Sequence, residues 1–138
     1  MNDLEVTTPA SSIPEVRLTL LADPSTVGLA REFVRYALSN WGFDAKLIND
    51  SMLVMSEIVT NAVTAVPGHE IRLRCALQDR APLLECWDLS PELPTPRPAS
   101  LTAENGRGLT IISAYAKKAG TRPCPTGEGK VVWALMPT

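Results

Sequence analysis

The chain has 138 residues, a net charge of −2 and an apolar content of 45%. This length predicts one domain with a sizeable core, and the apolar content excludes a wholly disordered chain. The small negative charge offers no basic surface, so we expect neither nucleic acid nor an acidic membrane as a partner. Because the chain has no run as long as a membrane span and no signal-peptide pattern at its start, the sequence predicts a cytoplasmic protein.

Three cysteines and one histidine leave little material for metal or nucleophile chemistry. Cys75 and Cys86 lie among apolar residues with strand periodicity, which predicts buried thiols rather than metal ligands. The single histidine, His69, follows a Pro-Gly turn. A zinc site or a histidine-based triad is therefore not expected.

The first part of the chain predicts a tail, a strand and a helix. Residues 1–14 are rich in Thr, Ser and Pro without periodicity, so we expect a flexible tail followed by one domain over residues 15–138. Residues 15–20 alternate apolar and polar side chains, as a half-buried strand does. Asp23, Pro24 and Ser25 provide a helix start, and the helix is expected to run to about Asn40.

A second helix is predicted from a cap at Asp44 to Pro67, with a wide apolar stripe. Glu57 and Asn61 are four residues apart and therefore share one face beside that stripe. A carboxylate and a carboxamide at the border of a core are costly unless something polar pairs with them. The plain interpretation is a satisfied polar edge, and the functional interpretation is a ligand site.

Two strands, over residues 70–78 and 83–88, are predicted on either side of a turn at residues 79–82. In the second strand Leu84, Cys86 and Asp88 fall on one face, whereas Leu83, Glu85 and Trp87 fall on the other. If Leu84 and Cys86 face the helices, then Asp88 does so too. Its carboxylate then needs a donor partner.

The last third of the chain predicts a long loop, a helix and two strands. Residues 90–102 contain four prolines and are expected to form an irregular loop. Gly106 and Gly108 precede a helix whose first N–H groups suit an anion, although such glycines often serve only tight packing. Strands over 119–124 and 130–136 close the chain. The element order predicts an α+β fold, a mixed, mostly antiparallel sheet with helices on one face.

Four segments, SEIVTNAV, WDLSPELP, NGRGLTII and GKVVWAL, occur in this order along the chain. Together they resemble the ATP site of the GHKL superfamily, and more narrowly the small bacterial anti-sigma factors and serine kinases. The resemblance covers about residues 16–135. It implies a two-layer α/β sandwich of the Bergerat type, with ATP and Mg²⁺ as cofactors.

The resemblance also implies residue roles. Asn61 would bind Mg²⁺, Glu57 would be the general base, and Asp88 would accept a hydrogen bond from the adenine amine. Gly106 and Gly108 would allow the backbone to approach the phosphates, within the segment that ends at Leu109. Arg107 would contact either phosphate or only solvent, and the resemblance favours neither. Residues 91–102 would form a short lid over the nucleotide.

Three departures from the family pattern concern activity. Ala65 stands where a histidine is usual, Ser90 replaces a glycine, and Val131 aligns with a threonine that is often near the adenine.

The expected function is an ATP-binding regulator that sequesters a sigma factor and phosphorylates a Ser or Thr of its antagonist protein. A non-catalytic, nucleotide-dependent binding module and a domain that has lost the nucleotide are the alternatives, so kinase activity stays open. Relatives also suggest a homodimer through the first helix and strand, where Phe33, Tyr36 and Trp41 could provide contact area or belong to the core.

Overall fold

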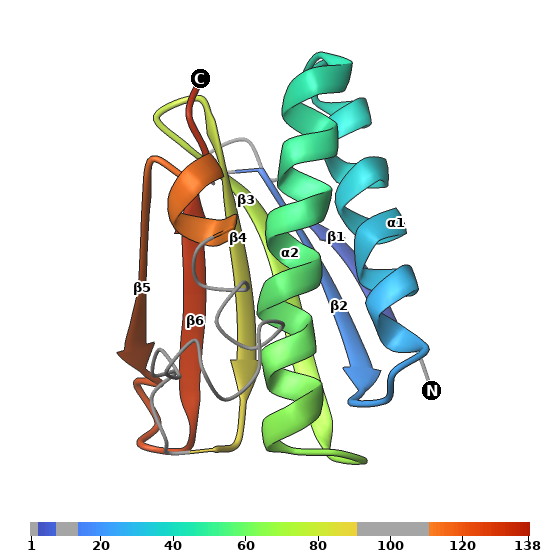
Figure 1. The fold of residues 1–138 in the computed structure, drawn as a ribbon, viewed down its shortest axis with the longest axis vertical. Coiled ribbons are helices and arrows are strands. Elements are labelled where there is room, and N and C mark those ends of the chain that lie inside the picture. Colours follow the sequence, from blue (N-terminus) through green and yellow to red (C-terminus); the bar gives the residue numbers. More distant parts are fainter. Residues whose placement is uncertain (1–2, 8–13, 91–110) are drawn as a thin grey trace, which may run out of the picture.

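The computed structural model describes residues 3–7, 14–90 and 111–138. Six strands form one sheet in the order β1-β2-β3-β4-β6-β5. The strands are β1 (Asp3–Thr7), β2 (Glu15–Leu21), β3 (Glu70–Gln78), β4 (Ala81–Asp88), β5 (Lys118–Pro123) and β6 (Lys130–Leu135). The helices α1 (Thr26–Asn40) and α2 (Ala45–Ala65), together with a short helix at residues 111–115, lie on one face of this sheet (Figure 1).

This arrangement confirms the α+β two-layer sandwich. All five pairings between the described strands are antiparallel, so the sheet is not mixed in the part that the structure describes. We call the face under the helices the covered face and the other one the open face. In Figure 1, α2 and β4 both run downward, so their C-terminal ends lie at the same end of the molecule.

Local sequence signals account for where the two long helices begin and end. The carboxylate of Asp44 caps α2 by accepting a hydrogen bond from the backbone N–H of Leu47, 2.8 Å away. Gly42, which has a φ of +81°, ends the connection from α1 in the left-handed conformation that glycine adopts without strain. Both boundaries agree with the sequence prediction to within one residue.

The expected flexible tail is wrong for residues 3–7, which form β1 along the outer edge of β2. The backbone N–H and C=O groups of β2 supply the pairing, and edge pairing of this kind needs little periodicity in the added strand. The sequence of residues 3–7 alone therefore does not predict a strand, because the strand depends on pairing with β2.

The turn between β3 and β4 is shorter than predicted. Only Asp79 and Arg80 lie outside the strands, and both have positive φ values, 51° and 68°, as in the two-residue turns that match strand twist. Ala81 and Pro82 belong to β4 instead. Proline lacks an N–H donor and is tolerated there because it stands at the start of β4, before the paired register with β6 begins at Leu83. Its carbonyl accepts a hydrogen bond from the N–H of Met136 at 2.8 Å.

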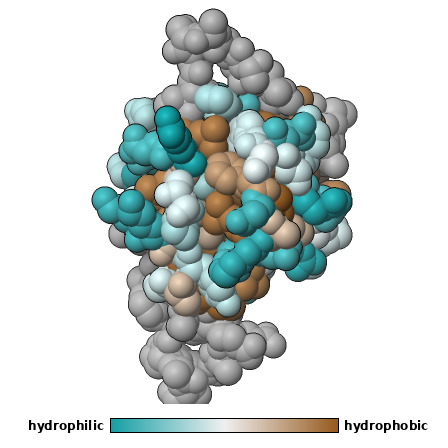
Figure 2. Space-filling view, turned by 90° about the horizontal axis from the view of Figure 1, so that it is seen from above, coloured by the Kyte–Doolittle hydropathy of each residue, from teal (hydrophilic) through white to brown (hydrophobic). Residues whose placement is uncertain are grey.

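The core lies between the sheet and the helices, and its fully buried members include Leu20, Leu38, Met55, Ile71 and Leu84. Seen from above, hydrophobic residues gather in the middle of the molecule and hydrophilic residues surround them (Figure 2). Phe33, Tyr36 and Trp41, for which the sequence allowed either a core or a surface position, differ in burial. Phe33 is buried and Trp41 packs partly against the core, whereas Tyr36 is 47% exposed.

Candidate functional site

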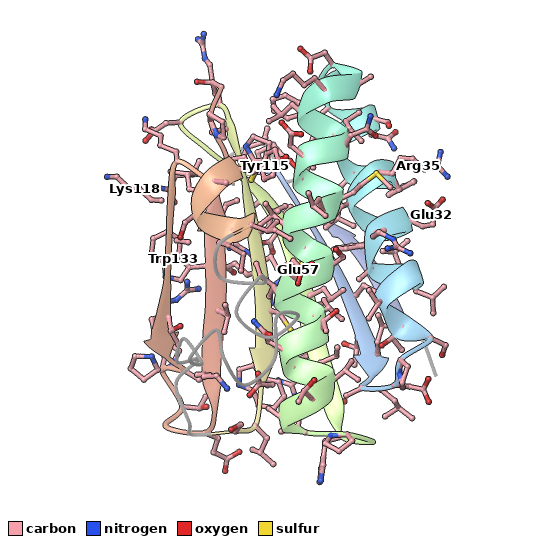
Figure 3. All side chains as sticks on the ribbon, viewed as in Figure 1. Glu32, Arg35, Glu57, Tyr115, Lys118 and Trp133 are labelled. Atoms are coloured by element: carbon pink, nitrogen blue, oxygen red, sulfur yellow. The ribbon has the colours of Figure 1, made fainter. Side chains whose placement is uncertain are left out.

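Helix α2 presents Glu57 and Asn61 at the border of the core. Both side chains are half-buried, and Figure 3 shows Glu57 about halfway along the helix. In the part of the chain that the structure describes, neither side chain has a hydrogen bond or an ion pair. The plain interpretation, a Glu in solvent and an Asn that bonds a neighbouring loop, stays a prediction, since residues 91–110 lie outside the described residues.

Strand β4 places Asp88 on the covered face, as the alternation predicted. Leu84 and Cys86 are buried under the helices, and Asp88 is only 2% exposed. Because β4 ends at this residue, the carboxylate lies at the end of the sandwich where the C-terminal half of α2 also lies (Figure 1). Asp88 and Asn61 are thus placed toward the same end of the molecule.

The donor partner of Asp88 is Lys130, the first residue of β6. The ammonium nitrogen of Lys130 lies 2.7 Å from Oδ1 of Asp88, and it also donates to the carbonyl oxygen of Ser90 at 3.2 Å. The backbone N–H of Ser90 donates to the same Oδ1 at 2.9 Å. Lysine and aspartate are rarely this well buried unless they are paired.

Sequence reasoning predicted a donor for Asp88 but missed Lys130. A signal was present, because Lys130 alternates with Val132 and Ala134, which face the core. The register pairs Asp88 with Lys130, so the two side chains lie on the same face.

The register of β6 decides which face of the sheet Val131 occupies. Val131 pairs with Trp87, and both lie on the open face. The side chain of residue 131 therefore points away from the face that holds the Asp88 carboxylate, because consecutive strand residues point to opposite faces. The residue of β6 that reaches the covered face beside Asp88 is Lys130, one residue earlier.

The turn before β6 packs directly against the end of β4. A Cβ atom added to Gly129 would lie 2.2 Å from the backbone oxygen of Asp88, so only glycine fits this close approach. The indole N–H of Trp87 donates to the carbonyl oxygen of Glu128 at 3.0 Å. These contacts fix the start of β6 and therefore the position of Lys130.

Four of the proposed site residues, Gly106, Arg107, Gly108 and Leu109, lie outside the described residues. The predicted lid at residues 91–102 also lies outside them. Their roles stay predictions. Of the three segments that the resemblance places around one nucleotide, the structure describes α2 and β4.

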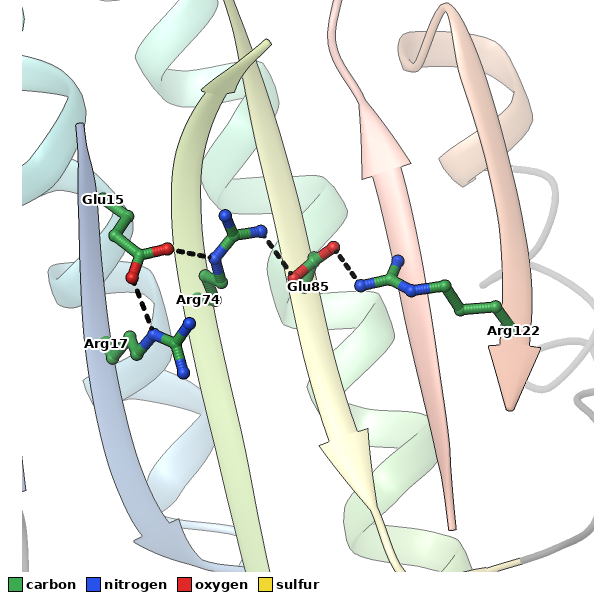
Figure 4. A network of polar contacts seen from close by, with 5 residues as sticks. All are labelled: Glu15, Arg17, Arg74, Glu85 and Arg122. Carbon is green, nitrogen blue, oxygen red and sulfur yellow. Dashed lines mark hydrogen bonds and ion pairs between the residues drawn. The ribbon is translucent and has the colours of Figure 1, made fainter. Parts of the chain in front are cut away.

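The open face carries a different polar cluster, an arginine–glutamate ladder of Glu15, Arg17, Arg74, Glu85 and Arg122 (Figure 4). Arg74 donates to Glu15 at 2.5 Å and to Glu85 at 2.9 Å, and Arg122 donates to the second oxygen of Glu85 at 2.7 Å. Next to the ladder, the guanidinium of Arg72 lies 4.4 Å from the centre of the Trp87 ring. Trp87 therefore lies on the open face, opposite to Asp88, as the alternation in this strand predicted.

An antiparallel sheet lies under two long helices, and polar side chains lie at the end of the molecule where both α2 and β4 terminate. This arrangement defines an α+β domain of the GHKL type. The family described as histidine kinase-like ATPase domain matches residues 20–136, so the chain belongs to that family. A comparison with curated proteins gave no match to this chain. None of the helices in the described residues has the length and hydropathy that crossing a membrane requires.

The residues that are described fit an ATP group. Asp88 has one oxygen, Oδ1, engaged by Lys130 and Ser90, and no described hydrogen bond goes to its other oxygen. Glu57 and Asn61 are half-buried polar groups without described partners. Among the described residues no group of three His, Cys, Asp or Glu could hold a metal by itself. The resemblance implies that Asn61 would hold Mg²⁺ together with the nucleotide phosphates, which is how protein-bound Mg²⁺ is usually held.

Proposed function

We propose that this chain binds Mg-ATP at the joint end of α2 and β4 and acts as a regulator of protein partners. Membership in the histidine kinase-like ATPase family supports ATP binding. The observation that carries the proposal is the Asp88 carboxylate, buried at the end of β4 with one oxygen left to accept a hydrogen bond. An amine on the nucleotide base is a suitable donor for that oxygen.

More specifically, we propose the regulatory activity that the resemblance implies. The chain sequesters a sigma factor and transfers phosphate to a Ser or Thr of the antagonist protein. Glu57 would accept the proton of the attacking hydroxyl, and Asn61 would offer its amide oxygen to Mg²⁺, which would neutralise phosphate charge. Bound ATP supplies the phosphoryl group, and the residues of α2 position the hydroxyl and the metal ion.

The second candidate function is a binding module without turnover. It is favoured by Ala65 and Ser90, which depart from the family pattern at positions that concern activity. Such a module would still bind ATP and the protein partner.

Titration calorimetry with Mg-ATP tests the shared part of the proposal. Binding to the folded state also raises the free energy of unfolding, by about 2.7 kcal/mol at a hundredfold excess of ligand over Kd. A chain that neither binds Mg-ATP nor gains stability from it would contradict the proposal.

Transfer of labelled phosphate to a serine-bearing antagonist separates the two candidates. Glu57→Ala should abolish transfer and leave ATP binding intact, whereas Glu32→Ala, on the outer surface of α1, should change neither (Figure 3). Transfer that survives Glu57→Ala would remove the base assignment. Absence of any transfer, with binding retained, would favour the module without turnover.

A further inference from the structure

The open face of the sheet contains a cavity of about 470 Å³, on the opposite side of the sheet from Asp88. Four arginines, Arg17, Arg72, Arg74 and Arg122, line it. The only carboxylate among the described residues of its lining is that of Glu85, and both of its oxygens accept hydrogen bonds from ladder arginines. Although the whole chain has a net charge of −2, the lining of this cavity is locally positive.

The two end members of the arginine–glutamate ladder have N–H donors that their described bonds do not use. In the described part of the chain, Arg17 donates only through Nε, to Glu15, and Arg122 donates only through Nη2, to Glu85. A guanidinium has five N–H donors in a planar fork that matches a carboxylate. Since the ladder begins and ends with an arginine, it has one more positive than negative charge and unused donors at both ends.

Beside the ladder, Arg72 and Trp87 form a fixed cationic and aromatic surface in the same cavity. The guanidinium of Arg72 lies 4.4 Å from the centre of the Trp87 ring, and its Nε donates to Glu70 at 2.8 Å. Val131, which pairs with Trp87, adds apolar lining. Tryptophan and arginine are among the residues that most often contribute binding free energy at protein interfaces. The lining therefore has the composition of a protein-binding surface.

The spacing of the unused donors favours an extended chain over a small anion. Glu15, Arg74 and Glu85 lie between the two end arginines of the ladder (Figure 4), so one phosphate or carboxylate group cannot contact both ends. The ends come from β2 and β5, which have three strands between them. With strands about 4.8 Å apart, this distance is at most about 19 Å, the length of about six extended residues.

We propose that this cavity is the docking site for an acidic segment of a partner protein, whose carboxylates bind the unused donors of Arg17 and Arg122 and whose chain packs on Trp87. The inference rests on the proposed function in one respect, because it requires a protein partner, and it names the surface that this partner contacts. The proposed nucleotide site lies on the other face of the sheet, so the two kinds of binding are measured separately.

The test uses a fluorescently labelled peptide of about eight residues that alternate Glu and Ser, long enough for the span. Fluorescence anisotropy measures its binding to the full chain at low ionic strength, with alternating Gln and Ser as the neutral control. The acidic peptide should bind at least about tenfold tighter than the control and should weaken as salt is added, because salt screens exposed charges. Equal Kd values, or no binding of the acidic peptide, would overturn the inference. Calorimetry with Mg-ATP decides the proposed function independently.

Alkylation of Cys124 shows where the peptide binds. Cys124 lines the cavity, whereas Cys75 and Cys86 are buried. At a peptide concentration of about ten times Kd, the reaction of Cys124 with iodoacetamide should slow by about tenfold, since only the unoccupied chain reacts. Binding without this protection would overturn the inference.

Two other occupants of the cavity give different patterns of protection. Protection of Cys124 that needs no peptide and increases with protein concentration would assign the cavity to a second copy of the chain. Protection by inorganic phosphate alone, at concentrations that also displace the peptide, would assign it to a small anion. Either result would overturn the inference.

Variants then assign the binding to the ends of the ladder. Arg17→Gln combined with Arg122→Gln should weaken the acidic peptide by roughly tenfold, about threefold for each exposed charged contact. Arg31→Gln combined with Arg35→Gln changes the net charge equally on α1, in the helical layer, and should leave the Kd unchanged (Figure 3). Equal weakening by both double variants would overturn the inference. Should the first double variant not fold, the protection of Cys124 in the natural chain decides.

Discussion

The two faces of the sheet hold charged groups in different ways. On the covered face, Asp88 and Lys130 form one pair whose side chains are 3% and 6% exposed. On the open face, the arginine–glutamate ladder spreads its charges over several strands, and its outer member Arg17 is 56% exposed. Water can replace a lost partner in the ladder but has little access to the buried pair. The same chemistry therefore has a different energetic weight on the two faces.

The largest effect is expected when the buried pair is broken. Lys130→Met should lower the free energy of unfolding by about 3–5 kcal/mol, because it leaves the Asp88 carboxylate buried without its counter-charge. Urea unfolding measures this, with Lys118→Met as the matched exposed control, which should stay within about 0.5 kcal/mol. A loss below about 1 kcal/mol in Lys130→Met would show that water reaches the pair after all.

A smaller loss is expected at the centre of the ladder. Glu85 is 5% exposed and accepts from both Arg74 and Arg122, so Glu85→Gln should cost about 1–3 kcal/mol in urea unfolding. The two arginines are partly exposed and can be rehydrated, which keeps the loss below that of Lys130→Met. Glu70→Gln, which removes an exposed pair with Arg72, is the matched control and should cost about 0–1 kcal/mol. Equal losses for Glu85 and Glu70 would contradict the assigned difference.

The ladder should also lose stability in acid. Burial alone would raise the pKa of Glu15, but the hydrogen bonds from Arg74 and Arg17 outweigh it and hold the pKa below its ordinary value of 4.5. A carboxyl group with a lowered pKa stabilises the fold above its unfolded pKa, and this contribution disappears as the pH falls through the folded pKa. The difference in unfolding free energy between the natural chain and Glu15→Gln should therefore be constant above about pH 6 and shrink below about pH 4.5. A difference that grew on acidification would reverse the assigned sign.

The reactivity of the cysteines compares the two faces in the natural chain, without a substitution that changes the free energy of unfolding. Burial raises the pKa of Cys75 and Cys86 on the covered face, whereas a hydrogen bond from Thr126, at 3.3 Å, helps to lower the pKa of Cys124. The thiolate is the reactive form, so iodoacetamide should modify Cys124 first. Peptide mapping by mass spectrometry checks this.

In increasing urea, Cys75 and Cys86 should become reactive together, at the concentration where the whole domain unfolds. Modification of Cys86 in the native protein, ahead of Cys124, would contradict the burial of this face.

Periodicity and caps allowed much of the fold to be predicted from the sequence. The alternation in β4 correctly placed Leu84, Cys86 and Asp88 on the covered face, and Asp44 marked the start of α2. These signals are local, since each depends on residues within one turn or one strand. The family match agrees with the fold that they indicate.

What failed depends on pairing between distant segments. Strand β1 exists because β2 has an edge to offer, which residues 3–7 alone do not reveal. Alternation placed Glu85 outward, yet it is buried because Arg74 and Arg122 cover it from the neighbouring strands. Whether Lys130 or Val131 lies on the covered face depends on the register of β6 against β4, because a shift of one residue exchanges the two faces of the strand.

The close contact between Gly129 and Asp88 bears on where this chain accepts added sequence. The hairpin tip at residues 126–129 has the small polar composition of a tolerant loop, and permissive loops usually accept tags or extra residues. Here the tip is anchored to the end of β4 by Gly129 and by the bond from Trp87 to Glu128. An insertion there would pull the first residue of β6 out of line. Engineers who need a permissive site should choose the two-residue Asp79–Arg80 connection, at the far end of the sheet.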